Sequence, residues 1–198
     1  MALTYHNNNS ISNVTSFAQV PSGSPTLLST ATASSSASIE FTSGIDSTYQ
    51  VYYFLFYLHP NTDDTSVGLN FSTDGGSNYN VTKTTTFFRA THREDDTNAT
   101  LEYRTNADLA QSTGNQPIGE AQEGESDSNL SGSLHLFNPS STTYVKHFIM
   151  NVSGTGNINL MENAYIAGYG NTTSAINGVK FFGNGTTITG TIKMYGIK

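Results

Sequence analysis

The final segment of the chain alternates strictly between two sets of side chains. One set is Ile192, Met194 and Gly196, and the other is Thr191, Lys193, Tyr195 and Ile197. A period of two is typical of a β-strand with one buried face, because successive side chains point to opposite sides of the sheet. We therefore expect a strand that pairs inside the fold. Ile192 and Met194 should point into the core beside Tyr53 or a neighbouring residue of a central strand.

In the segment 49–58, both sets of alternating residues are mostly apolar or aromatic, so both sides of a strand here would be apolar. A strand of this kind has to be covered on both faces, so we expect it to be central in a sandwich or buried by a neighbouring subunit. Pro60 follows it and ends it, because proline has no amide hydrogen to donate to a ladder.

Similar short segments recur along the chain between clusters of Gly, Asn, Ser and Pro. We predict further strands at 27–31, 37–41, 66–72, 79–82, 84–90, 131–137, 143–152, 158–168, 177–183 and 187–197. Segments 66–72 and 79–82 should form a hairpin, and 101–111 should hold a turn or two of helix. The pattern predicts an all-β chain with a single jelly-roll-like antiparallel β-sandwich over residues 26–198.

Residues 1–25 are rich in Asn and Ser and differ from the rest of the chain. Their apolar residues are widely spaced, and those that could fill pockets on a neighbour are Leu3, Ile11, Val14 and Phe17. We expect an N-terminal extended arm; a disordered leader and an arm that docks both remain open. The start lacks the cationic residues and apolar run of a signal peptide.

The composition limits the classes of partner. Charged residues make up 12% of the chain, about half of the usual share in a globular protein, so hydroxyls and amides must cover much of the surface. The net charge of −7 disfavours nucleic acid, and no apolar run reaches the ~20 residues that span a membrane as a helix. Without cysteine there is no disulfide framework. We expect no nucleic-acid or membrane partner.

Few residues suggest chemistry. The charged run 92–96, with Asp63 and Asp64 elsewhere, offers oxygen ligands but lacks the spacing of a calcium loop. His135 and His147 lie on strands that flank a short loop, where two histidines are more typical of packing than of a metal site. We interpret Glu120, Glu123 and Glu125 as a solvated acidic loop, because nothing near them in sequence would desolvate them. We predict no enzyme activity, no cofactor and no metal.

Several tyrosines are candidates for stacking against a glycan. They are Tyr79, Tyr103, Tyr165 and Tyr169. The flat face of an aromatic ring suits the C–H side of a sugar, although tryptophan is the usual platform and the chain has none. Packing in the core or at a subunit interface is the favoured interpretation for these residues.

The segment 72–79, Ser-Thr-Asp-Gly-Gly-Ser-Asn-Tyr, resembles the Asp-box turn of sialidases. In that turn the aspartate accepts backbone N–H groups and glycine supplies positive φ, so it is a structural device without a catalytic role. It occurs once here, which argues against a sialidase.

Three segments together carry a wider resemblance: 134–149, 170–182 and 190–198, with 72–79 and 42–49 in support. Over roughly residues 27–198 the chain resembles a family of structural proteins from tailed bacteriophages, many of them marine. The resemblance implies a virion protein made in the bacterial host cytoplasm. Its partners would be copies of itself, with a trimer as the first guess, and other virion proteins. The implied role is a capsid decoration or head-fibre protein; the alternative is a tail fibre or a module that binds a host surface glycan or receptor.

Overall fold

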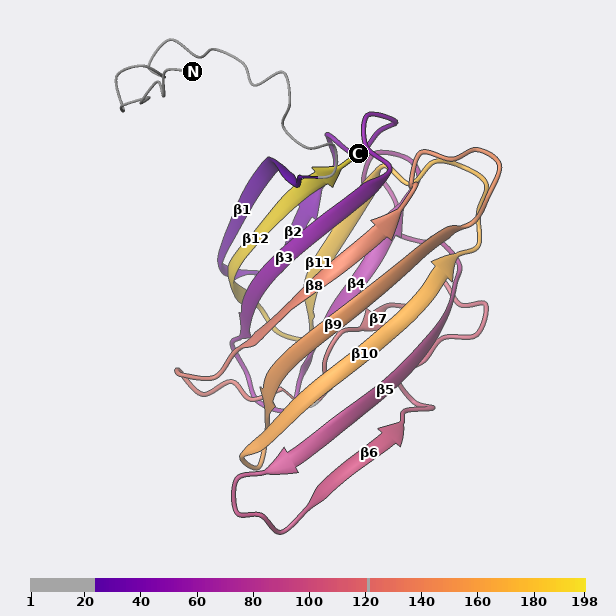
Figure 1. Cartoon of the computed structure of the whole chain (residues 1–198). Coiled ribbons are helices and arrows are strands. Elements are labelled where there is room, and N and C mark those ends of the chain that lie inside the picture. The colour runs from indigo at the N-terminus through magenta and orange to yellow at the C-terminus, as the bar shows by residue number, and fades with distance from the viewer. Residues whose placement is uncertain (1–23, 121) are drawn as a thin grey trace, which may run out of the picture.

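The computed structural model describes residues 24–120 and 122–198, which contain strands and loops but no helix (Figure 1). The arm residues Leu3, Ile11, Val14 and Phe17 lie outside this described part. The strands are β1 (Thr26–Ser36), β2 (Ser38–Phe41), β3 (Val51–Pro60), β4 (Ser66–Ser72), β5 (Lys83–Arg93), β6 (Ala99–Tyr103), β7 (Gln116–Pro117), β8 (Leu130–Phe137), β9 (Lys146–Gly156), β10 (Leu160–Gly170), β11 (Gly178–Asn184) and β12 (Ile188–Ile197).

The strands form two antiparallel sheets that face each other as a sandwich (Figure 1). The larger sheet has the order β1-β12-β3-β8-β9-β10-β5-β6, and the smaller has the order β2-β11-β4-β7. The first four strands of the larger sheet and the four of the smaller sheet alternate as in a jelly roll. The hairpin β9–β10 and the pair β5–β6 extend the larger sheet beyond it. The predicted all-β sandwich is confirmed.

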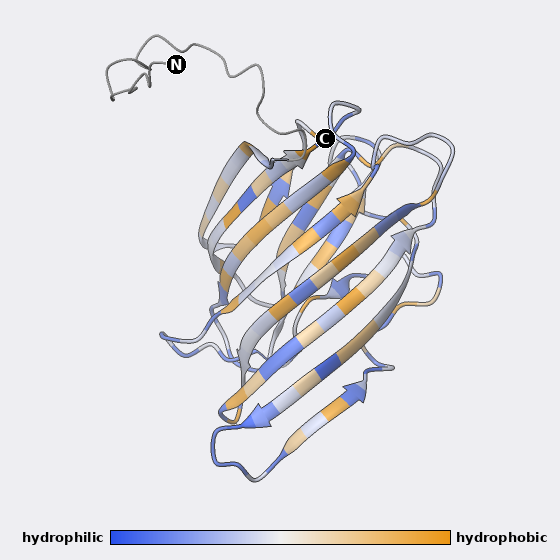
Figure 2. Ribbon diagram, in the orientation of Figure 1, coloured by the Kyte–Doolittle hydropathy of each residue, from blue (hydrophilic) through white to orange (hydrophobic). Residues whose placement is uncertain are grey.

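The core lies between the inner faces of the two sheets, where aromatic rings interlock. Phe181 of the smaller sheet packs against Phe54 and Phe56 of β3, with ring centroids 6.0 and 5.4 Å apart. Phe71 meets Phe148 edge to face at 5.2 Å. Burial of each such side chain contributes about 1.5–3 kcal/mol. Figure 2 shows the matching alternation of apolar and polar residues along the strands.

The terminal strand behaves as its alternation predicts. Ile192 and Met194 are buried, and Lys193 is exposed. β12 lies between β1 and β3, and its register places Met194 opposite Phe54. Tyr53, by contrast, lies on the other side of the sheet, where it is paired with Tyr195.

β3 is covered on one face. Its residues Tyr52, Phe54, Phe56 and Leu58 are buried, whereas Leu55 and Tyr57 are 41% and 59% exposed. The segment does lie inside the larger sheet, between β12 and β8, but the described residues leave its second face uncovered. Coverage by a neighbouring subunit stays a prediction.

The turn after β4 does not make the predicted hairpin. Asp74 does accept hydrogen bonds from Ser72 Oγ (2.7 Å) and the Asn78 amide (2.8 Å), and Gly75 and Gly76 have positive φ. A hydrogen bond from the Asn78 side chain is the largest cause that lowers the pKa of Asp74 to about 2, and the bonds from Ser72 and the Asn78 amide add to it. However, β4 pairs with β11 and β7, and the chain crosses to the larger sheet before β5. The turn connects the two sheets.

The predicted helix at 101–111 is also wrong. Strand β6 ends at Tyr103 and pairs with β5, because Leu101 and Tyr103 alternate with Thr100 and Glu102 in the period of a strand. The following segment runs along β5, where the amides of Arg104 and Thr85 bond to the Phe87 and Leu109 carbonyls. It then crosses to the smaller sheet, where the Ile118 amide bonds to the Val67 carbonyl.

We expect adjacent substitutions in β12 to differ sharply in cost. Met194→Asp would place a carboxylate without a partner in the core and should cost several kcal/mol of a stability of roughly 5–15 kcal/mol. Lys193→Asp should cost little, because this side chain points away from the core. Chemical denaturation of both variants measures the contrast. Similar losses from the two changes would contradict the assigned faces of the strand.

Candidate interaction surface

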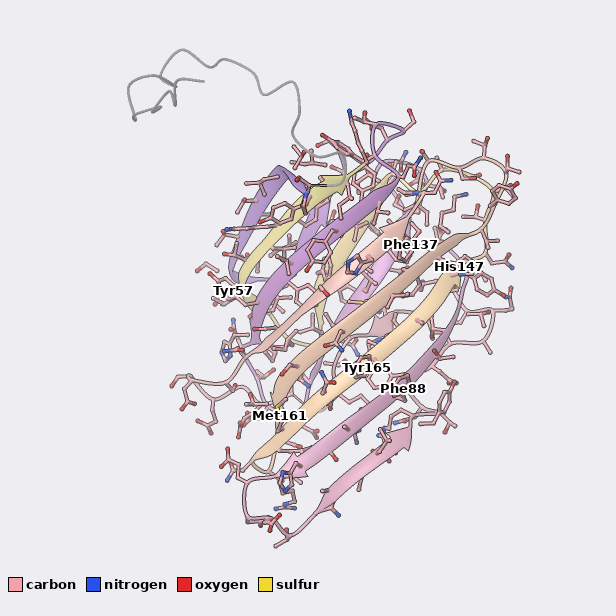
Figure 3. All side chains as sticks on the ribbon, in the orientation of Figure 1. Tyr57, Phe88, Phe137, His147, Met161 and Tyr165 are labelled. Carbon is pink, nitrogen blue, oxygen red and sulfur yellow. The ribbon has the colours of Figure 1, made fainter. Side chains whose placement is uncertain are left out.

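The eight-stranded sheet has one face that points away from the smaller sheet, and this face exposes many apolar side chains. We call it the outer face (Figure 3). The large residues on its strands β3, β5, β6, β9 and β10 that are at least 41% exposed are Leu55, Tyr57, Phe88, Leu101, Tyr103, Ile149, Met161 and Tyr165. They come from β3, β9, β10, β5 and β6, so the apolar character extends across most of the sheet. Exposed apolar patches of this kind mark interaction sites.

The same face is nearly free of charge. Strands of the larger sheet carry seven formally charged side chains: Lys83, Arg89, Arg93, Glu102, Lys146, Glu162 and Lys193. Strand alternation and register place all of these except Lys193 on the inner side. Among the described strands, the outer face therefore combines exposed aromatic rings with a single cation.

Phe88 and Tyr165 form the centre of one apolar region on this face. They are directly paired across β5 and β10, and their rings stack with centroids 5.2 Å apart and planes 9° apart. Beside them Ile149 and Ala167 line a shallow depression. Two stacked rings of this kind present a rigid apolar surface that loses little side-chain entropy when a partner covers it.

A groove of about 460 Å³ crosses the outer face over β8. Its floor is low because β8 contributes Ser131, Gly132 and Ser133 between the larger side chains of its neighbours. A Cβ at Gly132 would meet the Asn151 carbonyl oxygen at 2.5 Å, so the strands approach closely there.

Two polar side chains in this groove are held in place by neighbours. The Tyr57 hydroxyl donates to Thr191 Oγ1 at 3.2 Å, which orients the exposed ring. Asn163 Nδ2 donates to Asn151 Oδ1 at 3.2 Å, which directs the Asn151 amide. Lys193 lies at the edge of the same groove.

The tyrosines predicted to stack on a glycan do not form one platform. Tyr165 is stacked on Phe88, and Tyr103 is paired with Phe88 from the other side and donates to Asp108 at 2.7 Å. Tyr169 lies further along β10 beside His147. Tyr79 lies away from the outer face and donates to Glu40 at 3.1 Å. Their role with a sugar stays a prediction, and the sequence did not single out Tyr57, which lines the groove.

The predicted histidine pair is not directly opposed. Register pairs His135 with Ile149, and His135 packs against the Tyr53 ring at 4.4 Å. His147 lies beside Tyr169, with ring centroids 5.7 Å apart. In the described part of the chain, no group of three or more His, Asp or Glu side chains is placed to hold a metal ion. Within the charged run 92–96, two side chains contact each other: His92 Nε2 lies 3.0 Å from Asp96 Oδ1.

The interpretation of Glu120 as a solvated residue is wrong. Its side chain is 15% exposed and bonds to Arg104 Nε at 2.6 Å. Arg89 joins the same cluster, with contacts of 2.9 Å to Glu102 and 2.9 Å to Glu162. Glu125 is exposed, as expected.

Burial raises the pKa of Glu162, whose side chain is 2% exposed, and Arg89 opposes this rise. The hydrogen bond from Arg89 lowers the pKa of Glu102. The charged cluster ties β5, β6 and β10 to the segment before β8. The sequence pattern did not predict this cluster, although Arg89 and Glu162 lie in the buried phase of their strands, which is an unusual place for a charge.

Comparisons with known proteins identify no relative. No family model, no curated protein and no solved structure matches the chain. The resemblance to phage structural proteins therefore stays a prediction. Among the described residues, no helix has the length and apolar character needed to cross a membrane.

We expect Arg89→Met to be strongly destabilising, because it leaves the buried Glu162 without its cation. The cost should be about 3–5 kcal/mol near neutral pH. Burial raises the folded-state pKa of Glu162 and Arg89 opposes this rise, so removal of Arg89 raises that pKa further. The variant therefore loses more stability than wild type as the pH rises above the pKa of Glu162 in the unfolded chain. The loss should therefore shrink as the pH is lowered.

Arg93→Met is the matched control, because Arg93 pairs at 3.5 Å with the exposed Asp95. It should cost about 1 kcal/mol or less. Denaturant titrations between acidic and neutral pH measure both variants. An Arg89→Met loss that equals the control, or that does not change with pH, would refute the assigned role of the cluster.

Proposed function

We propose that this protein is a non-enzymatic structural subunit of a tailed-phage virion, a capsid decoration or head-fibre protein. The observation that carries the proposal is the outer face, which exposes apolar and aromatic side chains over most of a large sheet and has one formal charge. The centre of a protein interface has this character: charged residues are depleted there and aromatic residues are enriched.

A second copy of the chain is the partner that suits this face best. The whole chain carries a net charge of −7, which would repel a like-charged neighbour across most surfaces. Contact through the uncharged outer face avoids that repulsion and buries Leu101, Phe88 and Tyr57 from water. The proposed state is a homo-oligomer, with a trimer as the working stoichiometry, that also contacts other virion proteins.

The fold agrees with this role without deciding it. Jelly-roll sandwiches recur in viral capsid domains and in lectins, and a fold supports many functions. The resemblance of the 134–149, 170–182 and 190–198 segments to phage structural proteins favours the virion. Virion assembly is therefore the leading proposal.

The groove over β8 favours a second candidate function, which is binding of a host surface glycan or receptor. The Tyr57 ring is 59% exposed and is held by Thr191, and the amide of Asn151 is held by Asn163. A preorganised ring with an oriented amide beside it suits a sugar, and the groove has the size of small-ligand sites.

The oligomeric state of the purified chain tests the leading proposal. Light scattering at micromolar concentration should show a homo-oligomer. The double change Phe88→Ser and Tyr165→Ser should shift it to monomer while the subunit stays folded, because the two rings are 42% and 43% exposed in the isolated subunit.

Tyr144→Ser is the control, because Tyr144 is 71% exposed but lies in a loop outside the sheet. It should leave the oligomer intact. A wild-type chain that is monomeric and does not bind the particle would contradict the proposal.

If Tyr57→Ala abolishes binding to host cells while assembly is unchanged, the second function is the correct one.

The arm predicted at residues 1–25 gives a further test. Deletion of residues 1–20 should leave the sandwich folded but weaken incorporation into the particle, as measured by copy number in purified virions. A fall in melting temperature of roughly ten degrees, on the order of 2–4 kcal/mol for a domain of this size, would instead make the arm part of the domain.

A further inference from the structure

Two lysines are fully buried beside one glycine. Lys83 of β5 and Lys146 of β9 both pair in register with Gly170 of β10, and both are 0% exposed. Neither makes an ion pair with a carboxylate among the described residues. An ammonium group buried in this way is costly, so each lysine is biased toward its neutral amine.

The two lysines differ in what their amines contact. Lys146 Nζ donates to the Thr172 carbonyl at 3.0 Å. Lys83 Nζ lies 2.6 Å from Oδ1 of Asn70 and 2.9 Å from the Val81 carbonyl oxygen. Asn70 is itself 3% exposed. Lys83 therefore places an amine against a side-chain amide in a buried site.

Neighbours hold the Asn70 amide in one orientation. Its Oδ1 also accepts the Phe71 amide hydrogen at 2.9 Å, and its Nδ2 donates to Asn115 Oδ1 at 3.2 Å and to the Thr113 carbonyl at 3.4 Å. The Phe71 N–H thus polarises the carbonyl and would stabilise negative charge on Oδ1 during nucleophilic attack. The carbon that would be attacked is bonded directly to this oxygen.

We propose that Lys83 and Asn70 form an intramolecular isopeptide bond that joins the two sheets. The Lys83 amine attacks Cγ of Asn70 and forms a tetrahedral adduct with its charge on Oδ1. The adduct collapses, the new C–N bond stays, and the bond from Cγ to Nδ2 breaks. One amine hydrogen moves to the departing nitrogen, which leaves as ammonia. No oxidant or reductant is required.

The surroundings support each part of this reaction. Burial lowers the pKa of Lys83 to about 8, so a substantial share of the amine is neutral and nucleophilic at mildly alkaline pH. A solvent-open pocket of about 200 Å³ is lined by Asn70, Tyr79 and Asn115. It gives ammonia an exit and admits water to carry the proton. Fixed proximity of the two groups replaces a bimolecular encounter.

The bond would have a structural consequence. Asn70 lies on β4 of the smaller sheet, and Lys83 begins β5 of the larger sheet. β5 belongs to the part of the larger sheet that extends beyond the jelly roll. The bond would fasten that extension to the smaller sheet covalently, which suits a protein exposed to mechanical load or proteases.

Intact mass spectrometry of the full chain tests the proposal. Protein incubated for several days at pH 8–9 should have a mass about 17 Da below the sequence mass, because one ammonia is lost. Proteolysis should then yield a branched peptide that joins the Asn70 and Lys83 segments, while Lys146 stays unmodified.

Lys83→Arg is the matched control, and its mass should equal that of its own sequence. This control separates the bond from succinimide formation at the Asn177-Gly178 and Asn184-Gly185 sequences, which also releases ammonia but does not need Lys83. A wild-type chain that keeps its full mass after incubation overturns the proposal. A mass loss that persists in Lys83→Arg, or that maps to a linear peptide, overturns it as well.

Discussion

A sheet of four strands covers the inner face of a sheet of eight only in part. This difference in sheet size determines which parts of the larger sheet are covered by apolar strands. Where the jelly-roll strands face each other, aromatic residues such as Phe54, Phe181 and Phe71 fill the space. Under β10, β5 and β6 the smaller sheet is replaced by the segment that leads from β6 to β7, and buried polar contacts join apolar residues such as Phe87 and Ile166.

That polar region is stabilised differently from the apolar core. The Thr85 hydroxyl donates to Gln116 Oε1 at 2.6 Å, and Arg89 bridges Glu102 and Glu162. Most buried polar atoms have a partner there, because an unsatisfied one costs about 1–3 kcal/mol. Among the described residues, the buried side-chain atoms without a hydrogen-bond partner are Arg93 Nε and Gln122 Oε1. The larger sheet can therefore extend beyond the jelly roll, and this extension creates the wide outer face on which the proposed function depends.

The sequence predicted the elements better than their partners. Alternation located β12 and the burial of Met194, since it depends on neighbours in the chain. The pairing of β4 with β11 joins residues more than a hundred positions apart, so local sequence around Asp74 predicts a hairpin that the structure does not form. For the segment 49–58 the sequence left two alternatives open, and the exposed Leu55 and Tyr57 leave burial by a neighbouring subunit as the prediction for its second face.

The candidate surface was equally hard to foresee. Phe88, Tyr165 and Leu101 are far apart in the chain, and only the register of β5, β6 and β10 brings them onto one face. The sequence marks Tyr103 and Tyr165 as candidates for glycan stacking but does not show that both lie beside Phe88. The cluster at Arg89 was missed because Glu120, Glu102 and Glu162 converge from three segments.

We expect the outer face to be covered in the assembled particle. Hydroxyl-radical footprinting of the isolated subunit and of the assembled particle tests it most directly. The account predicts that Phe88, Tyr165 and Tyr57 lose most of their labelling on assembly, while Tyr144 in its loop keeps its labelling. Equal labelling of the outer-face rings in both states would contradict it.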